Sequence, residues 1–169
     1  MALRVDTKSR ITAAARISTT APMPRPAKPM LFASAEECEQ AFYDALENAD
    51  VEAMADLWLQ DDDVCCTHPG AARLVGYNAV RSSWASILES GPLPIRTLAR
   101  QSFESPTLAV TNLVEEIVLL QGTVRQLVHV IASNAFIKTP AGWKMVMHVG
   151  APAPQGQVVE VEVPSGTVH

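Results

Sequence analysis

The chain has 169 residues, 48% of them hydrophobic, and its formal net charge at pH 7 is −5. A chain of this length buries one ordinary core, and none of its apolar runs approaches the roughly 20 residues needed to span a bilayer, so we expect one domain and no membrane partner. Residues 1–30 carry six Lys and Arg against one Asp, whereas from residue 31 onward seven Lys and Arg stand against seventeen Asp and Glu. Such an acidic body repels phosphate backbones, which argues against nucleic acid as a partner.

Residues 1–30 are rich in Arg, Ser, Thr and Ala and close with a Pro-rich run over 21–26. This composition is typical of an organelle transit peptide and equally of a disordered extension. We favour a disordered extension over residues 1–32, with Met30 as an alternative start. The segment lacks the unbroken apolar stretch of a secretory signal, so we expect a cytoplasmic protein, with organelle targeting as the alternative.

Two helices are predicted next. Ser34 followed by Glu37 has the spacing of a capping box, and apolar residues then recur at helical intervals, which predicts a helix over 35–48. Asp50 is a second candidate cap and opens a shorter helical pattern that stops at the acidic residues 61–63. We interpret that acidic cluster as a solvated turn.

The rest of the organised chain is mostly strand. A strand over 64–68 ends at Pro69-Gly70, and a short arm at 73–75 precedes a third helix over 77–89. Four longer runs with β-branched or alternating residues follow, joined by short turns, at 95–103, 108–120, 124–137 and 143–149. This order predicts an α+β cone over residues 33–153, with three helices packed on a strongly bent, mainly antiparallel sheet and a flexible tail over 154–169.

Several segments resemble one known superfamily. They are Cys66-Thr67-His68-Pro69-Gly70, Ser83-Trp84 after Gly76, Ala132-Ser133-Asn134-Ala135-Phe136 and Gly142-Trp143-Lys144-Met145-Val146-Met147-His148. Across about residues 33–153 the chain resembles the nuclear transport factor 2-like superfamily, specifically its SnoaL-like branch, which includes folds like that of ketosteroid isomerase. The resemblance implies a cone-shaped domain around one cavity.

The same resemblance makes His68 the candidate catalytic residue. In ketosteroid isomerase the catalytic base is an aspartate directly before a proline, and His68 precedes Pro69 here. An imidazole with a pKa near 6.5 is mostly neutral at pH 7 and can accept a proton. The alternative is that His68 merely hydrogen-bonds the turn beside Trp58. Tyr43 is a positional candidate for the oxyanion donor that such a base needs.

Strand parity leaves the direction of several candidates open. Glu115 and Glu116 point to opposite faces, and hydrophobicity does not decide which one enters the pocket. Asn134 shares an apolar stripe, which suggests pocket lining or strand bridging, whereas His129 lies on the other face. Simple alternation points His148 away from the face of Trp143, Met145 and Met147. The candidate pocket residues are Tyr43, Trp58, Cys66, Trp84, Glu115, Asn134 and His148.

No metal site and no cofactor are expected. The four histidines form no helical His-x-x-x-His pair, and the three cysteines, Cys38, Cys65 and Cys66, form no Cys-x-x-Cys pair. Adjacent cysteines on a strand face opposite sides, so we expect free, reduced and mostly buried thiols.

Two functions remain open. The first is a cofactor-independent isomerase, dehydratase or cyclase that binds an apolar small molecule and uses His68 as general base. The second is a non-catalytic ligand-binding or assembly domain that forms a homodimer through the outer face of its sheet. Fold does not decide between them, so the sequence leaves open whether the protein is an enzyme.

Overall fold

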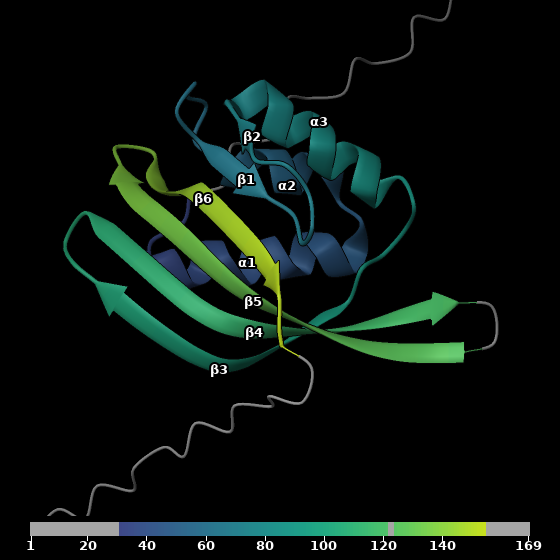
Figure 1. Ribbon diagram of the computed structural model, residues 1–169. Coiled ribbons are helices and arrows are strands. Elements are labelled where there is room, and N and C mark those ends of the chain that lie inside the picture. Colours follow the sequence, from purple (N-terminus) through teal and green to yellow (C-terminus); the bar gives the residue numbers. More distant parts are fainter. Residues whose placement is uncertain (1–30, 122–123, 155–169) are drawn as a thin grey trace, which may run out of the picture.

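The computed structural model describes residues 31–121 and 124–154. Three helices pack against one six-stranded sheet that curves around α1 without closing (Figure 1). The predicted α+β class, with three helices packed on a strongly bent and mainly antiparallel sheet, is therefore confirmed. Its elements are α1 (Ala35–Asn48), α2 (Val51–Leu57), β1 (Cys65–Thr67), β2 (Leu74–Val75), α3 (Tyr77–Leu88), β3 (Ile95–Glu104), β4 (Leu108–Gln121), β5 (Val124–Thr139) and β6 (Gly142–Pro152).

The two N-terminal helices begin at capped residues. The Ser34 hydroxyl accepts a hydrogen bond from the Glu37 N–H at 3.1 Å, and Glu37 Oε2 accepts one from the Ala33 N–H at 2.7 Å. Asp50 accepts from the Ala53 N–H at 2.9 Å in the same way. These bonds satisfy donors that the first helical turn leaves free, which explains why α1 begins at the residue predicted from sequence.

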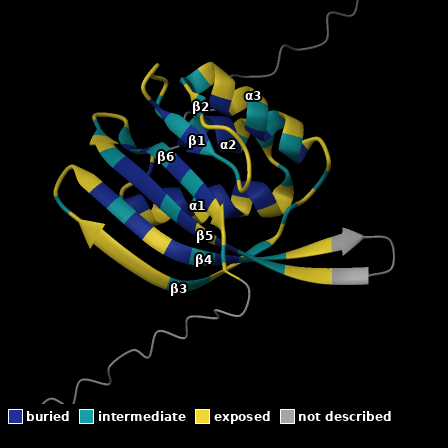
Figure 2. Ribbon diagram, in the orientation of Figure 1, coloured by how far each residue is buried: buried dark blue, intermediate teal, exposed yellow. Residues whose placement is uncertain are grey.

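The strands follow the order β2-β1-β6-β5-β4-β3, and every neighbouring pair is antiparallel except β1 with β6. The four long strands are each longer than predicted, and β4 and β5 continue as a hairpin beyond the helices (Figure 1). The buried residues gather between the helices and the concave face of the sheet (Figure 2). That concave face is the interior of the cone.

A bulge in β6 reverses the alternation of its side chains. Ala135 pairs with Met147 but Phe136 pairs with Met145, so Val146 is an extra residue on β6. Trp143 and Met145 face the interior before the bulge, and His148 does so after it, at 3% exposure. Simple alternation, which points His148 away from the buried face, therefore fails here because it does not hold across the bulge, and the direction that the sequence left open is inward.

A second bulge lies in β3. Leu98 pairs with Val114 and Gln101 with Asn112, so two residues of β3 stand opposite Leu113. Ala99 within this bulge has a φ of 49°, in the left-handed region. The irregularity changes the direction of Arg100, whose side chain reaches α1.

The first described residues pack against the turn that opens β6. Phe32 is buried, and its carbonyl accepts a hydrogen bond from the Trp143 N–H at 3.0 Å. Gly142 has a φ of +88°, and a Cβ there would lie 2.7 Å from the Phe32 carbonyl oxygen, so this turn requires glycine. Apart from residues 31, 32 and 154, the predicted extension over 1–32 and the tail over 154–169 lie outside the described residues. Within the described ranges, no helix is long and apolar enough to cross a membrane.

Candidate functional site

A cluster of polar side chains lies inside the cone. Glu39 and Tyr43 are four residues apart on α1, and Thr111 and Glu115 are four apart on β4, so each pair shares one face of its element. Asn134 reaches the same region from β5. These side chains are all at most 8% exposed, which is unusual for so many polar groups in a domain of this size.

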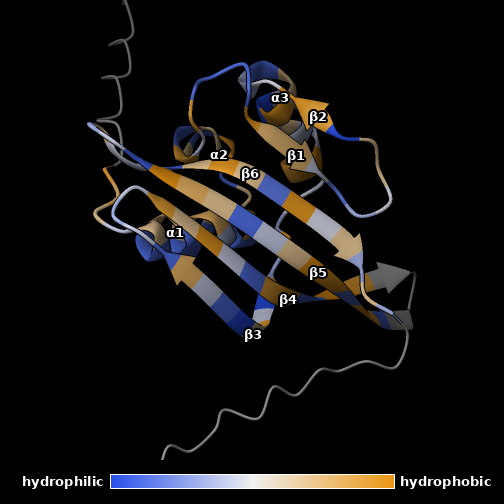
Figure 3. Cartoon of the chain, turned by 60° about the vertical axis from the view of Figure 1, so that its left-hand side comes forward, coloured by the Kyte–Doolittle hydropathy of each residue, from blue (hydrophilic) through white to orange (hydrophobic). Residues whose placement is uncertain are grey.

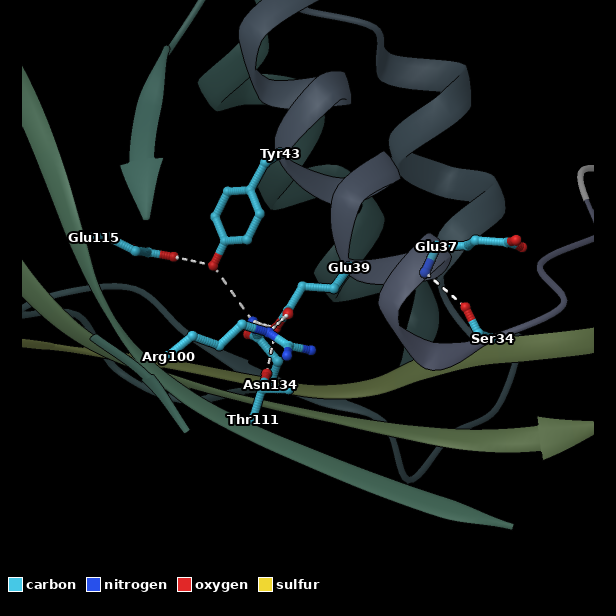
Figure 4. A network of polar contacts seen from close by, with 8 residues as sticks. All are labelled: Ser34, Glu37, Glu39, Tyr43, Arg100, Thr111, Glu115 and Asn134. Carbon is cyan, nitrogen blue, oxygen red and sulfur yellow. Dashed lines mark hydrogen bonds and ion pairs between the residues drawn. The ribbon is translucent and has the colours of Figure 1, made fainter. Parts of the chain in front are cut away.

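Hydrogen bonds join these side chains into one network (Figure 4). Tyr43 Oη donates to Glu115 Oε1 at 3.0 Å. Asn134 Nδ2 lies 3.0 Å from Glu39 Oε1 and 3.4 Å from Tyr43 Oη. The Thr111 hydroxyl donates to Glu39 Oε1. Every member thus has a partner, as buried polar groups require.

Arg100 connects the network to the surface. Its Nε donates to Glu39 Oε2 at 2.7 Å, and its side chain is 38% exposed against 6% for that of Glu39. Sequence analysis missed Glu39, Thr111 and Arg100. Glu39 shares a stripe with Tyr43 and Leu46 at i, i+4 and i+7, a pattern that could have placed it facing the core. No sequence signal pointed to Arg100, because its orientation depends on the bulge in β3.

The structure settles which of the two adjacent glutamates faces inward. Glu115 is 3% exposed and belongs to the network. Glu116 lies on the outer face, where it contacts Arg96 at 3.4 Å and His129 at 3.2 Å. Burial, and then the charge of Glu39, raises the pKa of Glu115 from 4.5 to about 7, although the hydrogen bond from Tyr43 lowers it. The carboxyl group can therefore hold or release a proton near neutral pH.

Tyr43 stays a phenol under the same conditions. Burial raises its pKa first, and the neighbouring Glu115 raises it further. Its hydroxyl is consequently a hydrogen-bond donor at neutral pH rather than a phenolate.

Two histidines flank Trp84 in the interior, and one of them, His148, contacts Asn134 of the network. The ring centroids of His68 and Trp84 are 4.6 Å apart, and those of Trp84 and His148 are 5.6 Å apart. Phe42 packs against both Trp84 and His148, at 5.3 and 5.2 Å. The contact between Phe42 and His148 is tilted, and the other three are edge-to-face, a geometry that fixes the orientation of the rings.

His68 is half-buried and His148 is fully buried. His68 Nε2 lies 2.9 Å from Ser83 Oγ and 3.9 Å from Cys66 Sγ. Burial lowers the pKa of His68. Burial, followed by the charge of His68, lowers the pKa of His148 to about 3, and its Nδ1 lies 2.8 Å from Asn134 Oδ1. Both rings are therefore neutral at pH 7.

Cys66 lies close to His68 on the buried side of β1. Burial, and then the nearby Cys65 and Glu115, together raise the pKa of its thiol to about 12. Cys38, Cys65 and Cys66 are all free. Hydrogen bonds run from Glu115 through Tyr43 and Asn134 to His148. Trp84 contacts both histidine rings, so the carboxyl group and both imidazoles lie in one neighbourhood.

Among the described residues, Trp58 is the one predicted pocket residue that contacts neither the network nor the group of His68, Trp84 and His148. It is buried and forms an isolated bridge with Met145 of β6. Within the described ranges, the indole N–H groups of Trp58 and Trp84 are both buried and have no hydrogen-bond acceptor. Buried donors without acceptors are rare, so the Trp84 N–H beside the two histidines is a candidate contact for a ligand.

A separate surface hollow of about 440 Å³ lies between the segment that follows α2 and the start of α3. Its lining residues are Gln60, Asp61, Asp62, Tyr77 and Asn78. None of the predicted pocket residues lines it. In the part of the chain that the structure describes, no three His, Cys, Asp or Glu side chains are grouped to hold a metal ion.

Comparison with known proteins identifies the family. The SnoaL-like domain matches residues 35–154. A proposed calcium/calmodulin-dependent protein kinase type II association domain from Thiobacillus denitrificans has 28% sequence identity and a TM-score of 0.67, and the match covers 74% of this chain and 99% of that one. A proposed dehydratase of the nuclear transport factor 2-like family from Streptomyces avermitilis has 29% identity and a TM-score of 0.63, covering 69% of this chain and 91% of that one.

A proposed ketosteroid isomerase from Parabacteroides distasonis shares the fold at 15% identity, with a TM-score of 0.57 and coverage of 71% of this chain and 88% of that one. Comparison with curated proteins finds no significant match. The match over residues 35–154 spans most of the chain and agrees with the observed cone, so the protein belongs to the SnoaL-like domain family of the nuclear transport factor 2-like superfamily.

Proposed function

We propose that the interior of the cone binds a neutral, largely apolar small molecule and moves a proton on it. The observation that carries the proposal is the convergence of Tyr43, His68, Glu115 and His148 in one buried region, where Asn134 and Trp84 link them. Buried ionisable groups cost desolvation free energy that apolar side chains would not. A cluster of them with shifted pKa values is typical of a functional site.

His68 has the properties of the general base. It is half-buried, so the residue keeps some accessible surface, and burial keeps its ring neutral at pH 7. The Ser83 hydroxyl at 2.9 Å from Nε2 can donate or accept, and therefore holds the ring both before and after it takes up a proton. In this role His68 removes a proton from a carbon or hydroxyl group of the ligand.

The pair formed by Glu115 and Tyr43 has the properties of the acid. A carboxyl group with a pKa of about 7 is protonated in a large fraction of molecules at neutral pH and can return a proton to the ligand. The Tyr43 hydroxyl, 3.0 Å from that carboxyl, is a donor that could stabilise negative charge on a ligand oxygen.

The relatives support this reaction class. The dehydratase from Streptomyces avermitilis and the isomerase from Parabacteroides distasonis are both named for reactions that move protons on small molecules. Isomerase, dehydratase and cyclase chemistry all fit a neutral base and an acid in a dry pocket. The substrate itself has to come from experiment.

Solvent-proton exchange tests the proposal. Small ketones and hydroxyketones that raise the melting temperature are incubated with the protein in D2O, and deuterium incorporation at carbon is followed by NMR. His68→Gln is expected to keep binding and to lower the exchange rate about 100-fold or more. Glu116→Gln, on the outer face, is the matched control. Exchange by His68→Gln within a few-fold of wild type would refute the assignment of the base.

A second candidate function is assembly, and the outer face of the sheet favours it. Val114 pairs with Ile131, and Val118 pairs with Leu127, across β4 and β5. Ile131, Val118 and Leu127 are 38–53% exposed. Figure 3 shows hydrophobic stretches along this hairpin. Exposed apolar stripes of this kind typically mark interfaces, and the relative from Thiobacillus denitrificans is named as an association domain.

We therefore propose a homodimer through this outer face, which is compatible with a ligand inside the cone. Leu127→Lys is expected to convert the dimer to a monomer in native mass spectrometry, because it places a charge in the buried interface. Val75→Lys changes an equally exposed residue on β2 and should leave the dimer intact. A monomeric wild type, or a Leu127→Lys variant that stays dimeric, would contradict the proposed interface.

A further inference from the structure

We infer that Arg100, Glu39 and Asn134 form a positioning relay that holds the His148 ring as its Nδ1–H tautomer, so that Nε2 is offered to a ligand as a hydrogen-bond acceptor. The use of Nε2 by a ligand rests on the proposed function, whereas the tautomer does not. The relay residues act through His148 and are positioning residues in this account.

The first step is the orientation of the Glu39 carboxylate. A guanidinium group only donates hydrogen bonds, and Arg100 Nε donates to Glu39 Oε2 at 2.7 Å. The other oxygen, Oε1, is thereby directed to β4 and β5, where it accepts from Thr111 and Asn134. As a carboxylate paired with the Arg100 guanidinium, Glu39 has no hydrogen of its own to donate and accepts at both oxygens.

The second step is the orientation of the Asn134 amide. Because the Glu39 carboxylate can only accept, the group that faces it at 3.0 Å must be the NH2 of Asn134. The amide oxygen consequently faces the opposite way, 2.8 Å from His148 Nδ1. Asn134 thus donates to the Glu39 carboxylate through its NH2 group and presents its amide oxygen, a hydrogen-bond acceptor, to the imidazole.

The third step is the tautomer. An amide oxygen has no hydrogen, so Nδ1 of His148 must carry the proton in this contact. Burial keeps the ring neutral, since its pKa is about 3, and the single ring proton is then on Nδ1. Nε2 is left with a lone pair, and among the described residues the hydrogen bonds of this ring are made at Nδ1 alone.

This arrangement selects a class of ligand. Nε2 can accept from a ligand hydroxyl or N–H group, whereas an ether or a carboxylate has only lone pairs to present and would repel it. His148 lies beside Trp84 and Phe42, so the donor group would sit on an otherwise apolar ligand. The relay therefore makes the site specific for ligands that bring a hydrogen-bond donor.

Nitrogen-15 NMR of the full, ligand-free chain tests the relay, because protonated and unprotonated imidazole nitrogens have well-separated shifts. We expect wild-type His148 to have a protonated Nδ1 and an unprotonated Nε2. In Glu39→Gln, Arg100 keeps the oxygen of the new carboxamide, so its NH2 faces Asn134. The Asn134 amide must then turn, and the His148 proton is expected to move to Nε2. Glu116→Gln makes the same change on the outer face and should leave the His148 tautomer as in wild type.

An Nε2–H tautomer in wild type would overturn the inference, as would an unchanged tautomer in a folded Glu39→Gln variant. If Glu39→Gln does not fold, Asn134→Leu replaces it. That variant removes the acceptor, so a mixture of both tautomers is expected, and a persistent Nδ1–H form would show that the relay does not set the tautomer. Because no ligand is present, failure of the proposed function leaves this result unaffected. Conversely, a result that refutes the relay would not change what is expected for ligand binding or for the deuterium-exchange assay.

Discussion

Replacing Glu115 by Gln is expected to change how the stability of the domain depends on pH. Burial raises the pKa of Glu115 from 4.5 to about 7, so the folded protein holds this proton more tightly than the unfolded chain does. Stability from this group is full below pH 4.5 and is lost as the pH rises through about 7. Since a tenfold difference in proton affinity corresponds to about 1.4 kcal/mol, ionising Glu115 costs the folded state about 3 kcal/mol.

His148 acts in the opposite direction over an overlapping range. Burial lowers its pKa from 6.5 to about 3, so the unfolded chain takes up a proton that the folded protein excludes. This group therefore reduces stability as the pH falls from 6.5 towards 3. In wild type the two titrations oppose each other between pH 4.5 and 6.5. Glu115→Gln removes one of them, so the stability of the variant should rise more steeply with pH.

Urea unfolding followed by tryptophan fluorescence measures the effect. As the pH is raised from about 4.5 to about 8, the unfolding free energy of Glu115→Gln should increase relative to that of wild type by about 3 kcal/mol, with an unchanged m-value. The carboxamide oxygen can still accept from Tyr43, so the pH-independent difference should stay within about 1 kcal/mol. Glu116→Gln is the control on the outer face. A difference that does not vary with pH would refute the buried, proton-holding carboxyl group.

Three further variants or reagents test other parts of the structure. Arg100→Met is expected to lower the free energy of unfolding by about 3 kcal/mol, because it leaves the Glu39 carboxylate buried without its cation. Arg96 forms an ion pair with Glu116, but its side chain is 73% exposed, so Arg96→Met should cost less than about 1 kcal/mol. Equal losses for the two variants in urea unfolding would contradict the ion pair between Arg100 and Glu39. A thiol reagent at pH 8 should modify Cys65 first, because burial raises the pKa of Cys38 and Cys66 to about 12. Rapid labelling of all three thiols in the folded protein, measured by mass spectrometry, would contradict the burial of Cys38 and Cys66. Ser34→Ala should lower the free energy of unfolding by about 1 kcal/mol because α1 loses its cap, and the same change at the exposed Ser86 on α3 should lower it less. Melting temperatures of both variants equal to that of wild type would argue against the cap.

Local chemistry made much of the fold predictable. Ser34 and Glu37 set the start of α1, and Pro69-Gly70 ended the first strand, because caps and turn residues act on their immediate neighbours. The same reasoning failed at His148, since the bulge at Val146 arises from pairing with β5 and leaves no mark in the alternation of β6 itself.

The polar site was only partly predictable for a related reason. Glu115 and Glu116 have equally apolar strand neighbours, so only the helix that packs on one face distinguishes them. Arg100 and Glu39 are 61 residues apart in sequence, and their ion pair exists because β3 bulges beside α1. Tertiary approach of this kind cannot be derived from the spacing of residues along one element.

The most direct test of the account is an NMR titration of the imidazole signals with a library of small, donor-bearing aromatic and alicyclic compounds. His68 and His148 lie in the interior, whereas His129 lies on the outer face beside Glu116. The signal of His129 therefore serves as an internal control. The account predicts that binders shift the signals of His68 and His148 together and leave those of His129 in place. Binders that shift His129 alone would contradict a ligand site inside the cone.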